Sequence, residues 1–355
     1  MAPKQRAVKD TDPNAAAHQD LKSPPQPWRA SAPGTTGGAG VGSQAGSDEG
    51  PGYRTLDYEV DGRVARLTFN RPEQGNSITP DTPLELADAV ERADLDPQVH
   101  VIVLSGRGRG FCGGYDLAAS AENLMDGAMS GALPRAGTVL DPLTQMANHD
   151  PAGTWDPMVD YAMMSRFTKG FASLLHANKP TVAKIHGFCV AGGTDIALHC
   201  DQIVIAADAK IGYPPTRVWG VPSAGLWAHR LGDQRAKRLL LTGDCLSGAE
   251  AENWGLAIEA PAPEDLDERT EILVQRIAAM PLNQLMMVKL VLNSALLAQG
   301  VQNSQMISTV FDGISRHTRE GYAFQQRAAE AGFRQAVRER DAAPYDDFGP
   351  STNKG

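Results

Sequence analysis

Alternating apolar and polar residues predict an antiparallel pair of strands near the start of the patterned sequence. The runs YRTLDYEV (53–60) and RVARLTF (63–69) are rich in β-favouring residues. Asp61-Gly62 separates them, and Asp-Gly between two alternating runs is a strong signal for a two-residue hairpin turn. The sequence therefore predicts a β-hairpin that begins at Tyr53.

A helix and a buried strand are predicted next. Residues 82–96 space Leu84, Ala87 and Val90 as on one face of a helix, and the pattern ends near Asp96. The continuous apolar run at 99–106 is typical of a strand buried on both faces. The glycine-rich stretch GRGRGFCGGYDL follows that strand directly.

The same order of elements occurs a second time. Residues 167–180 read as a helix that stops before Pro180, and 181–188 as a strand running toward the glycine pair Gly192-Gly193. A helix starting at that pair and two further strands, at 202–208 and 209–213, come next. Repeated strand–turn–helix units favour an α/β fold.

Composition divides the chain into four parts. Residues 1–52 are dense in Gly, Pro, Ser and Ala without apolar periodicity, so we expect a disordered N-terminal extension. An α/β core spans 53–255 and contains a long insert at about 118–160, which is expected to be functional or mobile. A strongly helical region covers 256–341, and 342–355 form a tail.

The bulk chemistry excludes several classes of protein. Hydrophobic residues make up 42% of the chain and charged residues 21%, which suits a globular enzyme with a real core. The net charge of −9 argues against nucleic-acid binding, and no apolar run is long enough to span a membrane. The four cysteines and eight histidines show no metal-ligand spacing, so no metal is expected, and the cysteine pattern favours a cytoplasmic location.

Two glycine pairs carry the chemical signal. Gly113-Gly114 and Gly192-Gly193 each follow a predicted buried strand, where backbone N–H groups become free. Two such amides brought together would form an oxyanion hole for a carbonyl oxygen, and glycine leaves room for the substrate to approach. For either pair alone, a tight turn with nothing bound is the favoured interpretation, and two pairs in equivalent contexts shift the balance toward a site.

From residue 53 to about 348 the chain resembles the enoyl-CoA hydratase/isomerase (crotonase) superfamily. The resemblance depends on five segments in the family's order: LTFNRPEQGNSIT, GRGFCGGYDL, KPTVAKIHGFCVAGGTDIALHCD, LTGDCLSGAEAENWGL and REGYAFQQRAAEAGF. It implies a crotonase-type spiral of repeated ββα units with a helical C-terminal region used in assembly. A homotrimer or a dimer of trimers is the oligomer that this implies.

The resemblance also implies an acyl-CoA thioester as the ligand, with no further cofactor. The amides of Gly113 and Gly192 would polarise the thioester carbonyl, and Asp195 would take the place of a catalytic glutamate. Coenzyme A would lie along 71–76 and 113–117. The expected substrate-binding residues are Gly113, Gly114, Tyr115, Asp116, Gly192 and Tyr213.

The sequence departs from the family at the second catalytic carboxylate. An ungapped comparison puts Pro215 at that position, and proline can act neither as an acid nor as a base. Asp195 keeps a carboxylate but is one methylene shorter than glutamate. Tyr213 could donate a hydrogen bond, although its ordinary pKa near 10 makes it a poor base.

Other residues of the chain are candidates for the missing groups. His149, Asp150, Asp156 and Asp160 of the insert could supply an acid or base, with a lid or a subunit contact as the simpler reading. Lysines that the family often places near the CoA phosphates are absent. Arg107, Arg109, Arg334 and Arg338 could replace them, although a solvated surface charge is the favoured interpretation of each one alone. His186, His199 and Asp201 are expected to be structural.

Three functions remain open at this stage. The first is hydration of a 2-enoyl-CoA, with Asp195 handling the proton or orienting the water. The second is isomerisation, thioester hydrolysis or C–C cleavage that uses the same oxyanion hole and a single carboxylate. The third is an acyl-CoA-binding protein without catalysis, which the lack of a carboxylate at Pro215 favours.

Overall fold

The structure is a computed structural model, which describes residues 52–116 and 136–342. All of these residues belong to one unit, which spans Glu49–Gly355. The N-terminal extension, the first part of the insert and the tail lie outside the described residues, apart from Gly52 and Ala342. The disorder expected for residues 1–52 therefore stays a prediction.

The N-terminal hairpin is confirmed. Strands β1 (Leu56–Asp61) and β2 (Val64–Phe69) pair antiparallel, with Asp61 opposite Val64. Gly62 in the turn has a φ of +58°, a conformation that glycine adopts without steric cost.

A five-stranded sheet contains the buried strand predicted at 99–106. Its order is β1-β2-β3-β4-β6, and β2, β3 (Val101–Gly106), β4 (Thr181–Ile185) and β6 (Gln202–Ile205) are parallel. Val101 to Leu104 are at most 3% exposed, as expected for a strand covered on both faces.

A second, three-stranded sheet carries the glycine turns and corrects one prediction. It consists of β5 (Phe188–Val190), β7 (Lys210–Gly212) and β8 (Cys245–Ser247), in that order. The single strand expected at 181–188 is two strands in different sheets. The chain turns at Gly187, where φ is +59° and a Cβ atom would overlap the carbonyl oxygen of Arg109.

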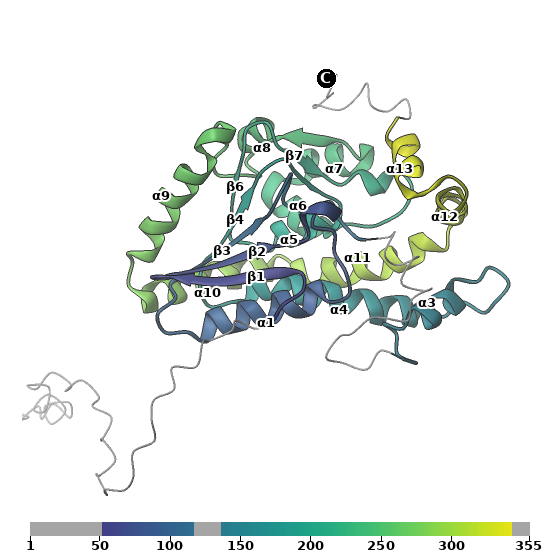
Figure 1. Cartoon of the computed structure of the whole chain (residues 1–355), viewed down its shortest axis with the longest axis horizontal. Helices are drawn as coiled ribbons and strands as arrows, with labels where there is room; N and C mark the ends of the chain where they lie inside the picture. The colour runs from purple at the N-terminus through teal and green to yellow at the C-terminus, as the bar shows by residue number, and fades with distance from the viewer. Residues whose placement is uncertain (1–51, 117–135, 343–355) are drawn as a thin grey trace, which may run out of the picture. The chain divides into compact units, whose positions relative to one another are not determined.

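Helices cover the larger sheet on both sides (Figure 1). Helices α1 (Thr82–Leu95) and α4 (Pro157–His176) pack together, and α9 (Leu266–Ala278) packs against β3, β4 and β6. The apolar face predicted for α1 is shifted. Leu86 and Ala89 are fully buried, whereas Leu84 is 37% exposed, because only the packing partners decide which side of the apolar stripe turns inward.

The helical C-terminal region expected from the sequence is present. The remaining helices are α3 (Pro142–His149), α5 (Gly192–Ala197), α6 (Ala224–Leu231), α7 (Asp233–Thr242), α8 (Gly248–Trp254), α10 (Leu282–Ala298), α11 (Val301–Arg316), α12 (Arg319–Ala331) and α13 (Phe333–Asp341). Three short 3-10 helices complete them: η1 (Pro72–Gln74), η2 (Pro214–Arg217) and η3 (Pro263–Asp265). The insert thus contributes α3 and the start of α4, which the sequence pattern did not indicate.

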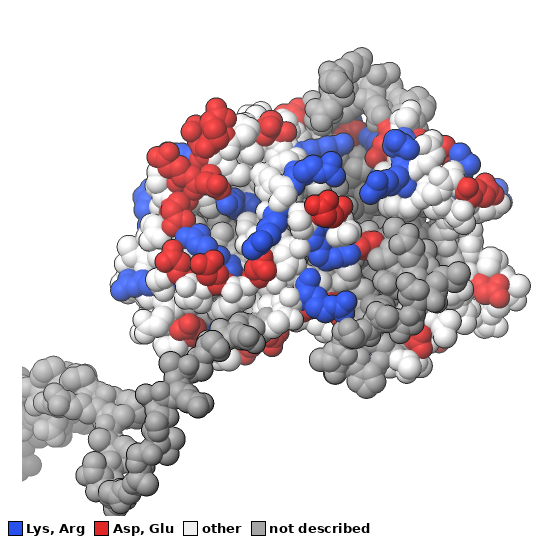
Figure 2. Space-filling model, viewed as in Figure 1, with Lys and Arg blue, Asp and Glu red and all other residues white. Residues whose placement is uncertain are grey.

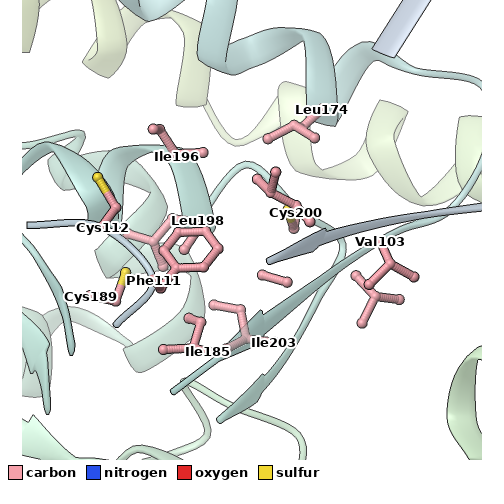
Figure 3. Packing of buried hydrophobic residues seen from close by; sticks show 14 of the residues in the cluster. Val103, Phe111, Cys112, Leu174, Ile185, Cys189, Ile196, Leu198, Cys200 and Ile203 are labelled. Carbon is pink, nitrogen blue, oxygen red and sulfur yellow. The ribbon is translucent and has the colours of Figure 1, made fainter. Parts of the chain in front are cut away.

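The core joins side chains of the larger sheet and of α1, α4 and α9, and it reaches the segment just before the first glycine pair. In Figure 3, the ring of Phe111 lies beside Leu198, with Ile185 and Ile203 close by. All four cysteines are buried and unpaired. The residues just before the first glycine pair are therefore anchored in the core, which limits how far that turn can move.

None of the helices in the described part of the chain is both long and apolar enough to cross a membrane alone. Two successive helical segments, Pro263–Ala278 and Leu282–Ala298, would together be long and apolar enough, but the chain bends by 104° between them.

Candidate active site

The two glycine turns meet, as the oxyanion-hole hypothesis requires. Cys112 and Cys189 form a parallel bridge, and the amide of Val190 donates to the Cys112 carbonyl oxygen at 3.0 Å. A Cβ atom on Gly114 would lie 3.4 Å from the amide nitrogen of Gly192. The turns are so close that glycine is needed at this contact.

The prediction that the Gly113 amide is a free donor is wrong. This N–H donates a 2.9 Å hydrogen bond to the carbonyl oxygen of Gly75, so it serves to hold the loop before the first glycine turn. The sequence pattern located the turn, but the pairing of each amide depends on a loop almost forty residues away.

The amides of Tyr115 and Gly192 are the available donors instead. The amide of Ile78 donates to Gly114 and the amide of Asp116 donates to Ile78, at 2.8 and 2.9 Å. Because alternate residues of a paired segment turn their N–H groups to opposite sides, the Tyr115 amide points away from this bridge. Within residues 52–116 and 136–342, no group accepts a hydrogen bond from the backbone N–H of Tyr115 or of Gly192.

Backbone strain precedes the second donor. Ala191 adopts a φ of +53° and a ψ of −132°, a conformation that costs a non-glycine residue about 1–3 kcal/mol. Hydrogen bonds hold it there: its amide donates to Gly212, and its carbonyl oxygen accepts from the amide of Thr194 at 2.9 Å. The strained residue sets the direction of the next amide, that of Gly192.

Asp195 lies buried one turn into the short helix α5. It is 5% exposed, and its Oδ1 accepts a 2.8 Å hydrogen bond from the amide of Ser223. Burial raises the pKa of the Asp195 carboxyl to about 7, although the hydrogen bonds from Ser223 oppose the shift. At neutral pH this side chain therefore exists in both protonation states, as suits a proton-transfer group.

Two adjoining cavities surround these groups. The larger has a volume of about 720 Å³, and the smaller one of about 10 Å³. Among the described residues, Asp195 lines only the small cavity. Four residues line both cavities and form the boundary between them: Tyr115, Met164, Tyr213 and Asp312.

The wall of the large cavity is mostly apolar with a few polar groups. Its apolar residues include Met146, Met163, Phe167, Trp219, Phe324 and Phe333. Its polar and charged residues include Asp116, His149, Asp160, Lys210, Asp312 and Arg316. An elongated ligand with an apolar part and a few polar anchors fits this kind of wall.

Tyr115 and Tyr213 act at most as hydrogen-bond donors here. Burial, together with the charges of Asp195 and Asp312, raises the pKa of both phenols well above the usual value near 10. Both tyrosines are therefore neutral at physiological pH. Tyr213 lies in the wall of the large cavity, consistent with the substrate-binding role predicted for it.

Asp116, one of the expected substrate-binding residues, holds the first glycine loop in place. Its Oδ2 accepts from Arg71 at 2.8 Å and from the hydroxyl of Ser77 at 2.9 Å. This partly buried ion pair ties the loop after β2 to the turn that contains Gly113. Asp116 therefore lines the cavity while its carboxylate is bound to Arg71 and Ser77 of the protein.

Pro215 lies in the cavity wall, where it supplies no acid or base. It belongs to η2, and its carbonyl oxygen accepts from the amides of Val218 and Trp219. The loss of a carboxylate at this position, which the sequence indicated, is therefore a loss from the large cavity itself.

The insert brings two of its four candidate residues to the cavity. His149 and Asp160 line it, whereas Asp150 and Asp156 accept hydrogen bonds from the amides of nearby residues at helix ends. Asp160 Oδ2 accepts from the side chains of Asn148, Trp155 and His317 at 2.8–3.1 Å. These bonds join the insert to the end of α11.

The basic residues at the cavity differ from those proposed from sequence. Lys210, Arg316 and Arg340 line it, while Arg107, Arg109, Arg334 and Arg338 are not among its described wall residues. Arg107 pairs with Asp57 at 2.7 Å, and Arg338 donates to Gln335. In Figure 2, acidic side chains gather over the α9 end, and basic ones spread toward α13.

The residues expected to be structural are so. His199 is buried, its Nδ1 lies 2.5 Å from the Asp195 carbonyl oxygen, and burial lowers its pKa to about 4. His186 contacts the carbonyl oxygen of Gly108. Asp201 accepts from Thr181 and pairs with the buried Lys289 at 2.9 Å.

Two features of the site escaped the sequence analysis. Asp312 and Arg316 on α11 face the same cavity as the glycine turns, although more than 110 residues separate them from α5. No local motif marks them, because their role depends on how α11 packs against α4. Within the described part of the chain, no cluster of His, Cys, Asp or Glu side chains could hold a metal ion.

The fold and site together define the class of protein. Parallel strands feed two glycine turns that meet beside a buried carboxylate, and the C-terminal region is helical, as in crotonase-fold enzymes. The enoyl-CoA hydratase/isomerase family model matches residues 59–134 and 155–330, most of the chain. The chain belongs to this family and is an enzyme of the crotonase superfamily.

Known proteins support this assignment. A crystal structure of an enoyl-CoA hydratase from Mycobacterium smegmatis shares 68% identity and a TM-score of 0.76, over 81% of this chain and 93% of that one. The (E)-benzylidenesuccinyl-CoA hydratase of Thauera aromatica is 29% identical over 78% of this chain and 98% of its own. The 1,2-epoxyphenylacetyl-CoA isomerase of Escherichia coli is 28% identical over 66% and 80%, respectively.

Proposed function

We propose that this enzyme hydrates a 2-enoyl-CoA thioester, with the carbonyl oxygen held by the amides of Tyr115 and Gly192. The observation that carries the proposal is the meeting of the two glycine turns beside Asp195. Negative charge develops on the thioester oxygen when the double bond is attacked. A preorganised pair of amide donors stabilises that charge, and losing one donor typically costs 10²–10³ in turnover.

Asp195 supplies the proton at the α-carbon. Its pKa of about 7 leaves a substantial protonated fraction at neutral pH, because burial disfavours the charged form. The thioester enolate, formed when oxygen adds at the β-carbon, takes this proton and restores the carbonyl. For this transfer the acyl end must reach the boundary formed by Tyr115 and Tyr213.

Coenzyme A enters only as part of the substrate, and we propose no additional cofactor. Lys210 provides positive charge on the cavity wall and would attract its phosphates, whereas Arg340 is paired with Asp341 at 2.8 Å. The acyl group would occupy the apolar part of the cavity, near Phe167 and Trp219. Most of the chemistry then comes from the chain's own amides and carboxylates.

Isomerisation is the second candidate. Pro215 removes one acid or base from the large cavity, and a single carboxylate can shuttle a proton between two carbons of the substrate. The similarity to an isomerase of Escherichia coli favours the same possibility. Thioester hydrolysis and binding without catalysis rank below it, because the donor pair and Asp195 are retained together.

Incubation with short-chain, long-chain and aromatic 2-enoyl-CoAs tests the proposal, with the products identified by mass. Hydration adds the mass of water, isomerisation leaves the mass unchanged, and hydrolysis releases free coenzyme A. Product with added water supports the proposal. Binding measured by calorimetry, without product from any thioester, would contradict it and favour the non-catalytic alternative.

We further propose that the enzyme assembles as a homotrimer or a dimer of trimers in the cytoplasm. Helices α10 and α11 expose large apolar side chains, including Val291 (71%), Leu292 (64%) and Phe311 (52%). Apolar side chains gathered in this way are typical of a protein–protein interface. The four unpaired cysteines suit a reducing compartment.

A further inference from the structure

A second buried carboxylate lies beside Asp195. Asp312, on α11, is 8% exposed and lines both the small cavity of Asp195 and the large cavity. Asp312 can therefore reach both a group in the large cavity and the side chain of Asp195.

One loop holds the two carboxylates. The amide of Val221 donates to Asp312 Oδ1 at 3.1 Å, and the amide of Ser223, two residues on, donates to Asp195 Oδ1 at 2.8 Å. Two residues of chain span at most about 7 Å, so the two amides keep the carboxylates close. The amide of Gly220 donates to Ser315 on α11 and fixes the same loop.

The two carboxylates have different electrostatic surroundings. Asp312 Oδ2 lies 2.9 Å from Arg316, which also approaches Asp160 of α4 at 4.0 Å, whereas no cation contacts Asp195 among the described residues. The other titratable groups that face Asp312 are Tyr115 and Tyr213, both neutral. Pairs of carboxyl groups in unlike surroundings take opposite acid and base roles.

We propose that Asp312 is a catalytic residue, the base that activates water, with Asp195 as the acid; this rests on the proposed hydration. The Asp312 carboxylate takes a proton from water as the water oxygen bonds to the β-carbon. The π electrons move to the thioester oxygen and return as the α-carbon takes the proton of Asp195. The proton on Asp312 then passes through solvent to Asp195, which restores both groups.

Asp312→Asn tests this role. The amide oxygen can still accept from Val221, but the ion pair with Arg316 is lost, so melting temperature and acyl-CoA binding are measured as checks on folding. We expect kcat to fall by about a hundredfold or more. Asp312→Glu should recover part of that loss. Asp233→Asn on α7 is the matched control, because it removes one carboxylate whose side chain is 71% exposed and lines neither cavity, and it should keep wild-type turnover.

A readout without substrate separates catalysis from structure. The charge of Asp312 raises the pKa of Asp195, so Asp312→Asn should lower the pKa of Asp195, as measured by carbon NMR of the labelled carboxyl. Wild-type turnover in Asp312→Asn would overturn the inference and leave the proposed function standing. Absence of turnover by the wild-type enzyme with every thioester would overturn both.

Discussion

The backbone amide of Ser223 donates a 2.8 Å hydrogen bond to Asp195, in a pocket where no cation contacts the carboxylate among the described residues. The bond fixes the direction of the carboxyl group without neutralising its charge. The pKa of Asp195 therefore stays raised, at about 7, because burial outweighs the hydrogen bonds from Ser223.

Asp195→Asn should lower turnover of a 2-enoyl-CoA by about a hundredfold, because the amide cannot deliver a proton. In the wild-type enzyme, kcat should decline as the pH rises through about 7, where the acid form of Asp195 is lost. Steady-state rates at pH 5–9 measure both effects. A rate that instead rises through pH 7 would assign Asp195 as a base and support isomerisation.

The pH dependence of the free energy of unfolding should also report the raised pKa of Asp195. The pKa of Asp195 rises from 3.8 in the unfolded chain to about 7 in the native state, so between these values the native carboxyl is protonated while the unfolded one is charged. The contribution of protonated Asp195 to the free energy of unfolding is therefore lost as the pH rises from about 4 to 7. Asn cannot ionise, so Asp195→Asn should become more stable than the wild type over this range, by at most about 4 kcal/mol. Urea unfolding at each pH measures the difference. A constant difference between the two proteins would show that the carboxyl is not perturbed.

Gly192→Ala should disable the donor pair. The added Cβ would lie 2.7 Å from the partly buried ring of Tyr115 and 2.8 Å from Ile78, so the turn must shift. Turnover should fall at least a hundredfold, as for loss of one oxyanion donor. Gly153→Ala is the control, because its Cβ would meet its nearest neighbour only at 3.4 Å. Equal turnover in the two variants would show that Gly192 supplies no donor.

Leu292→Glu on α10 should dissociate the proposed oligomer, because a charged side chain is costly in a buried apolar interface. Light scattering with size-exclusion chromatography should give a trimer or hexamer for the wild type and smaller species for the variant. Leu241 on α7 is 82% exposed, and Leu241→Glu should leave the mass unchanged. A monomeric wild type would remove the proposed interface.

Local sequence patterns were enough for the hairpin, the buried strand and both glycine turns. Alternation, apolar runs and Asp-Gly act over a few residues, so at these places they depend little on contacts with distant segments. The same patterns failed where packing chooses between local options. Leu84 faces outward on α1, and the chain breaks at Gly187 because Arg109 lies against it.

The sequence by itself determined the family, the position of Asp195 and the absence of a carboxylate at Pro215, since these are properties of single residues in recognisable motifs. Only the tertiary structure decided which amides are free. Gly75 occupies the amide of Gly113, and the pairing with Ile78 turns the amide of Tyr115 the other way. It also brought Asp312 to the site. Hydrogen-bond partners and cavity walls come from segments far apart in the chain, and no local pattern records which of them will meet.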